Sequence, residues 1–156
     1  MTVVEAVLNA ASLFTFVREE PKGSNAGQAV EHFLRHTKTP KGQPWCASFV
    51  CAILDGMLGQ RNPVPTTASC QAIADWGKTS GRIAKAPSQG AIFLLWFPSL
   101  GRYAHTGFVV RQIDDRHWET IEGNTGDVGE REGYGVFRKT RTFGVMDRFI
   151  PWYEGL

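Results

Sequence analysis

The chain has 156 residues, a formal net charge of +2, and a composition that is 42% apolar and 21% charged. This length and balance predict one globular domain over residues 1–156 with its own hydrophobic core, and they exclude an intrinsically disordered chain. The nearly even charge, and the lack of a basic run interleaved with aromatic residues, argue against a nucleic-acid partner. The three cysteines are widely and irregularly spaced, which predicts reduced thiols in a reducing compartment instead of a disulfide framework.

The amino terminus carries Glu5 and no early Lys or Arg, so we expect no secretory signal peptide. No apolar run reaches transmembrane length, so we expect no membrane insertion. The protein is therefore expected to be made in the cytoplasm, and action outside the cell would need separate machinery to release it. The sequence does not indicate an oligomeric state.

Helical spacing of apolar residues dominates the first half of the chain. The helix predicted to begin at about Cys46 follows a proline-containing loop and is expected to end at Gly59. Either Thr67 or Ser69 could cap the helix that runs through Ile73 and Trp76. The predicted helices are one from Val3 to about Phe14, one capped by Asn25 that buries Val30, Phe33 and Leu34, one from about Cys46 to Leu58, and one through Ile73 and Trp76.

From residue 87 onward, short β-rich runs alternate with Gly, Asp and Asn, which is typical of an antiparallel meander. Helices that come first and strands that come second predict an α+β fold, with N-terminal helices packed on a C-terminal antiparallel sheet. The predicted strands cover residues 91–97, 106–111, 117–121, 134–139 and about 146–152.

Cys46 is the candidate nucleophile, because it lies in the first turn of a predicted helix. The unpaired N–H groups and the positive end of the helix dipole favour a thiolate there, and the same N–H groups could stabilise an oxyanion. Cys51 lies within the apolar helix and Cys70 opens the next helix without a cationic neighbour in sequence. We expect both of these to be structural.

His105 is the best candidate for the base that a thiol nucleophile needs. It is expected to open a strand at the rim of the sheet, and Gly107 on the same face leaves room beside its ring. His32 and His36 share a helix face at zinc-binding spacing without the glutamate of a metalloprotease motif, which favours a solvated face. His117 is expected at a surface hairpin.

Glu122 and Asn124 end the strand that should pair with the His105 strand. They lie two residues apart, so either could orient the imidazole as the third member of a catalytic triad. Residues 122–127 are also turn-forming, and a turn and a catalytic role are compatible. The Cys and His residues lack the close pairs of structural zinc sites, so no metal is expected.

Three segments, at residues 44–50, 105–110 and 120–125, resemble the CHAP family (cysteine, histidine-dependent amidohydrolase/peptidase) of the papain-like NlpC/P60 superfamily, in both their sequences and their order. Segment 88–93 resembles the family's strand entry, although Gln89 and Ala91 depart from it, and segment 133–136 resembles a later strand. The likeness extends from about residue 25 to residue 149. The three segments are Pro-Trp-Cys-Ala-Ser-Phe-Val at 44–50, His-Thr-Gly-Phe-Val-Val at 105–110 and Thr-Ile-Glu-Gly-Asn-Thr at 120–125.

The resemblance implies a papain-like fold in which Cys46 is the nucleophile, His105 the general base and acid, and Glu122 with Asn124 orient the imidazole. It also implies cleavage of peptidoglycan amides, either between muramic acid and L-alanine or within the peptide stem and crossbridge. Some members hold calcium through aspartates just before the cysteine. Residues 37–45 contain no carboxylate, so we expect no calcium and no other cofactor.

Residues that flank the motifs in sequence, namely Gln43, Trp45 and Tyr103, are expected to line a substrate groove. Two alternatives remain open: a non-catalytic wall-binding module, and a cysteine amidase that acts on a non-wall amide. A phage lysin, an antibacterial effector and a host wall-remodelling enzyme are not distinguished by this sequence.

Overall fold

The computed structural model describes residues 1–126 and 133–156, and within them it contains helices followed by an antiparallel sheet. The predicted α+β class is confirmed. In chain order the elements are α1 (Val3–Ser12), α2 (Gln28–His36), α3 (Cys46–Leu58), the 3₁₀ turn η1 (Gly59–Arg61), α4 (Cys70–Thr79), β1 (Ile92–Phe97), β2 (Arg102–Gln112), β3 (Trp118–Thr125), β4 (Gly135–Arg141) and β5 (Arg148–Ile150).

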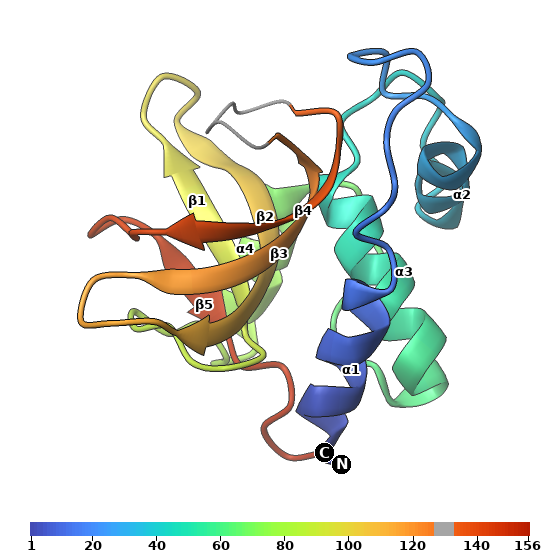
Figure 1. The fold of residues 1–156 in the computed structure, drawn as a ribbon. Helices are drawn as coiled ribbons and strands as arrows, with labels where there is room; N and C mark the ends of the chain where they lie inside the picture. Colours follow the sequence, from blue (N-terminus) through green and yellow to red (C-terminus); the bar gives the residue numbers. More distant parts are fainter. Residues whose placement is uncertain (127–132) are drawn as a thin grey trace.

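The sheet has the strand order β4-β3-β2-β1-β5, with antiparallel neighbours throughout. Strands β1 to β4 form the predicted meander, and β5 returns to pair with the other edge of β1 (Figure 1). Strand β2 begins at Arg102, earlier than expected, because pairing with β1 continues past an irregularity between Leu95 and Trp96. His105 therefore lies inside a long strand and not at its start.

Local sequence signals account for most helix boundaries. Thr2 and Glu5 form a capping box at α1, the Ser69 hydroxyl accepts the Ala72 N–H at α4, and Gly59 ends α3 with a positive φ of 54°. The prediction that Asn25 caps α2 is wrong. The cap residue is Gly27, which makes no side-chain cap, and the Glu31 side chain accepts the Gly27 N–H at 2.9 Å.

Helix α3 packs directly against β2 and β3, beside α1 and α2 (Figure 1). A Cβ at Gly123 in β3 would lie 2.8 Å from both Phe49 Cβ and Trp45 Cζ3, closer than carbon atoms normally approach. Only glycine therefore lets β3 come this near to the start of α3. The close approach brings the amino end of α3 beside the middle of the sheet.

Across the two described ranges, every helix is too short or too polar to cross a membrane.

Candidate active site

Cys46 is the first residue of α3, as the sequence predicts, and it lines a small cleft. The residue is 4% exposed, and the cleft has a volume of about 250 Å³. The loop before α3, the start of α4 and the start of β2 form its walls. Its lining residues include Gln43, Cys46, Cys70 and Arg102.

His105 and Glu122 form a buried pair across neighbouring strands. Nε2 of His105 lies 2.7 Å from Oε1 of Glu122, and the two residues are 2% and 0% exposed. Gly107 makes room for this pair, because a Cβ there would lie 2.9 Å from Glu122 Cγ and 2.8 Å from Phe93 Cε1. The predicted space beside the imidazole is therefore the space that the Glu122 side chain occupies.

Glu122 also receives hydrogen bonds from two residues that the sequence analysis did not identify. Thr120 Oγ1 donates to Oε2 at 2.5 Å, and Arg141 on β4 donates from Nη2 to Oε1 at 2.6 Å and from Nε to Oε2. Burial by itself would raise the pKa of Glu122, but the bonds from Arg141 and His105 outweigh it and hold the pKa far below its ordinary value. The carboxylate therefore stays charged at the centre of the site.

The pKa values of Cys46 and His105 shift in opposite directions. A hydrogen bond with Cys70 lowers the pKa of Cys46 well below 9.0 despite burial, and a hydrogen bond with His105 and its charge lower it further. Burial would lower the pKa of His105, but hydrogen bonds with Cys46 and then Glu122 raise it to about 9. At neutral pH these shifts favour a thiolate beside an imidazolium, which together supply a nucleophile and a proton donor.

Of the two residues that could orient the imidazole, Glu122 is the one in contact with it. Asn124 is buried and has a positive φ of 54°, at a point where pairing between β3 and β4 is irregular. Its Oδ1 has no hydrogen-bond partner among residues 1–126 and 133–156. The predicted turn is thus a local distortion within β3, and its last residue, at position 127, lies outside the described residues.

The three residues expected to line a substrate groove differ in their placement. Gln43 lines the cleft. The prediction for Trp45 is wrong: the ring is 0% exposed, stacks on Phe33, and donates its indole N–H to buried Glu19 at 2.9 Å. Tyr103 is not among the residues that line the cleft, and its hydroxyl donates to the Met146 carbonyl.

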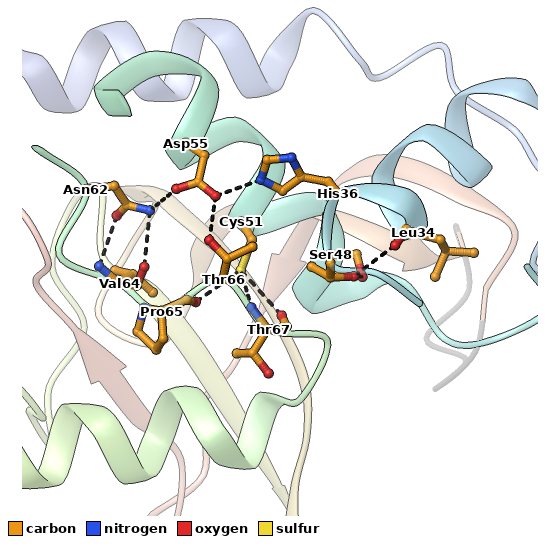
Figure 2. Close-up of polar contacts among 11 residues, drawn as sticks. Leu34, His36, Ser48, Cys51, Asp55, Asn62, Val64, Pro65, Thr66 and Thr67 are labelled. Carbon is orange, nitrogen blue, oxygen red and sulfur yellow. Dashed lines mark hydrogen bonds and ion pairs between the residues drawn. The ribbon is translucent and has the colours of Figure 1, made fainter. Parts of the chain in front are cut away.

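Cys51 and Cys70, both predicted to be structural, are buried, but their sulfurs have different neighbours. Burial raises the pKa of Cys51 to about 11, and its sulfur contacts the backbone of Pro65 and Thr67 (Figure 2). The Cys70 sulfur instead lies 3.7 Å from that of Cys46, although the two residues are on different helices. No sequence spacing signals this contact, because it depends on how α3 and α4 are each placed against β2.

The other histidines lie elsewhere. His36 is half-buried and not fully solvated, since its Nε2 lies 2.6 Å from Asp55 Oδ2 (Figure 2). His117 contacts Asp114 at an exposed turn, as predicted. In residues 1–126 and 133–156, no three His, Cys, Asp or Glu side chains gather in a way that could hold a metal ion.

Comparison with known proteins identifies a shared fold. No family model matches the chain, and no curated protein matches it. The chain is similar to a solved structure described as the crystal structure of Ly7917, with 18% sequence identity and a TM-score of 0.55. The similarity covers 96% of this chain and 62% of the other, so the chain spans less than two thirds of that structure.

Proposed function

We propose that the protein is a cysteine hydrolase of the papain-like NlpC/P60 type that cleaves amide bonds in bacterial peptidoglycan through a thioester intermediate. The observation that carries this proposal is the buried series Cys46, His105 and Glu122, drawn from α3, β2 and β3. Each member supplies one function that covalent amide hydrolysis needs: a nucleophile, a proton carrier and a group that orients the carrier.

In the first half-reaction, the Cys46 thiolate attacks the carbonyl carbon of the amide and forms a carbon–sulfur bond. Nε2 of His105 faces Glu122, so Nδ1 is the ring nitrogen that remains for Cys46 and the leaving group. The imidazolium gives its proton to the departing amine as the carbon–nitrogen bond breaks. The products of this step are a free amine and an acyl thioester on Cys46.

In the second half-reaction, neutral His105 takes a proton from water, and the resulting hydroxide attacks the thioester carbonyl. The carbon–sulfur bond breaks, the acid is released and the Cys46 thiolate returns. The N–H groups of the first turn of α3, which have no acceptor within the helix, lie beside Cys46 and can stabilise the negative oxygen in both steps.

Glu122 supports both steps without contacting the substrate. Its fixed negative charge stabilises the imidazolium, and its 2.7 Å bond to Nε2 fixes the ring's orientation. Arg141 and Thr120 in turn hold the Glu122 carboxylate in place.

The choice of substrate depends on the resemblance of the three sequence segments to the CHAP family. It implies either an N-acetylmuramoyl-L-alanine amidase or an endopeptidase of the stem or crossbridge. Gln43 and Arg102 line the cleft around the nucleophile and can donate hydrogen bonds to the carbonyl groups of a peptide.

The decisive experiment is digestion of purified peptidoglycan, with the newly exposed amino termini identified by mass spectrometry. A freed L-alanine amine identifies the amidase, and freed stem or bridge amines identify an endopeptidase. Cys46→Ala and His105→Ala should each abolish turnover while circular dichroism remains native. His117→Ala is the matched control at an exposed histidine, and it should retain activity.

Substantial turnover by Cys46→Ala would rule out covalent catalysis. If Cys46→Ala bound peptidoglycan as the native protein does, and neither protein released new amines, the protein would instead be a wall-binding module.

A further inference from the structure

Two thiols share the cleft, and their positions suit the formation of a disulfide. Sγ of Cys46 and Sγ of Cys70 are 3.7 Å apart, and each residue is the first of its helix. A disulfide has a sulfur–sulfur distance of about 2.05 Å, so the two sulfurs need to move closer by less than 2 Å. Rotation of the two side chains is the smallest change that could close this gap.

We propose that Cys46 and Cys70 form a modification site for hydroperoxides, in which Cys46 is oxidised first and Cys70 resolves the product into a reversible disulfide. The structure shows why this pair, and not a pair that includes Cys51, is assigned. Cys46 and Cys70 both line the same cleft, whereas Cys51 is fully buried and points to backbone groups of the connector between α3 and α4.

The proposed chemistry has two balanced steps. The Cys46 thiolate attacks one oxygen of the hydroperoxide, the O–O bond breaks, and the products are a sulfenic acid and hydroxide or alkoxide. The Cys70 thiol then attacks the sulfenic sulfur, the S–O bond breaks, and water leaves with the thiol proton. Overall, one thiolate and one thiol lose two electrons and one proton, and the hydroperoxide is reduced to water and hydroxide or alkoxide. An added dithiol reverses the change by thiol–disulfide exchange.

The protonation state of Cys46 matches its role as the residue that is oxidised first. The hydrogen bond between them lowers the pKa of Cys46 and raises the pKa of Cys70 well above 9.0, so one sulfur is the thiolate and the other retains its proton. A thiolate is the form that attacks a peroxide. The Cys70 proton is then available to leave with the oxygen as water.

The segment that leads to Cys70 is fixed to α3 by a polar network (Figure 2). Asp55 in α3 accepts hydrogen bonds from Asn62 at 2.6 Å and from Thr66 at 2.7 Å, and Cys51 receives the Thr67 N–H. Ser69 then caps α4. These contacts tie the start of α4 to the body of α3, so the two sulfurs stay close together without a covalent link.

A disulfide between Cys46 and Cys70 would block the Cys46 sulfur, which is the proposed nucleophile, and would therefore stop hydrolysis. The predicted loss of hydrolysis rests on the proposed function, but the predicted crosslink does not, because it concerns only the two sulfurs. A test that maps the crosslink therefore separates failure of this proposal from failure of the hydrolase proposal.

The test treats the full-length native protein with a stoichiometric amount of hydrogen peroxide and then blocks the remaining thiols with iodoacetamide. Of the three free thiols, we expect one to remain, and peptide mass spectrometry should show a peptide containing Cys46 linked to one containing Cys70. Dithiothreitol should restore all three. Cys51→Ala is the matched control, and it should form the same crosslink.

Cys70→Ala and Cys70→Ser should form no crosslink, and Cys46 should progress in them to the irreversible sulfinic acid. Either variant is sufficient if the other does not fold. The proposal is overturned if native Cys46 reaches sulfinic acid as fast as it does in Cys70→Ala, if the crosslink includes Cys51, or if all three thiols survive a peroxide excess.

Discussion

Replacing Glu122 with Gln tests the electrostatic core of the site while preserving the size of the side chain. The rise in the pKa of His105 from 6.5 to about 9 corresponds to roughly 3 kcal/mol in favour of the imidazolium. Cys46 and Glu122 both contribute hydrogen bonds and charge to this rise. If Glu122 supplies about half, its neutralisation costs roughly 1.5 kcal/mol, which is about tenfold in the equilibrium constant between the ion pair and the neutral pair.

Turnover of peptidoglycan should fall further than the ion-pair population, because Glu122 also orients the imidazole. Loss of orientation in a catalytic triad can reduce kcat by about 10⁴-fold, so we expect a decrease between about tenfold and 10⁴-fold. Glu119→Gln is the matched control. Glu119 lies on the same strand and, like Glu122, has two cationic partners. These partners are Arg111 and Arg138, and the pairs lie at the surface. Its replacement should change turnover less than twofold, in keeping with weak surface ion pairs.

The pH dependence gives a second readout for Glu122→Gln. Folding raises the pKa of His105, so protonation of this residue stabilises the native protein fully below pH 6.5, and the contribution is lost as the pH rises through about 9. Native activity should decline over the same range as the imidazolium loses its proton. In Glu122→Gln, both the decline in activity and the loss of stability should move to lower pH.

The assay measures the rate at which iodoacetamide labels Cys46 as a function of pH, by peptide mass spectrometry. Peptidoglycan turnover is measured over the same pH range. Burial raises the pKa of Cys51 to about 11, so Cys51 in the same sample provides an unreactive reference. Identical pH profiles for the native protein and Glu122→Gln would refute the role assigned to this carboxylate.

Two other substitutions test the surroundings of Glu122. Arg141→Gln removes the guanidinium from a buried carboxylate and should lower the free energy of unfolding by about 3 kcal/mol. The control Arg138→Gln, on the same strand, should change the free energy of unfolding by less than about 0.5 kcal/mol. Equal urea midpoints for the two variants would contradict this prediction. Gly107→Ala places a Cβ 2.7 Å from the Ile121 carbonyl oxygen and should lower the free energy of unfolding by about 1–3 kcal/mol. In the control Gly56→Ala, on an exposed part of α3, the new Cβ meets no atom within 4 Å, so the free energy of unfolding should rise by about 0.5–1 kcal/mol. Urea unfolding measures both, and a stabilising Gly107→Ala would show that the space beside Glu122 is not needed.

Local patterns in the sequence are sufficient for the order and type of the elements. Helical spacing of apolar residues places α3, Gly59 ends it, and β-rich runs separated by turn residues define the meander. These signals work because the spacing of apolar residues follows the local backbone period of a helix or a strand. The position of Cys46 at the start of α3 is predictable for the same reason.

The partners within the site depend on contacts between elements that are distant in sequence. Arg141 is opposite Trp118 in the β3–β4 register, yet its side chain reaches Glu122 four residues along the neighbouring strand. Cys70 meets Cys46 because α3 and α4 both pack against β2. Trp45 is buried by stacking on Phe33 and by the hydrogen bond from its indole N–H to Glu19. By itself, therefore, the sequence determined the elements and the candidate residues Cys46, His105 and Glu122. The tertiary structure alone decided which side chains surround them, because packing across elements sets burial, hydrogen bonding and charge.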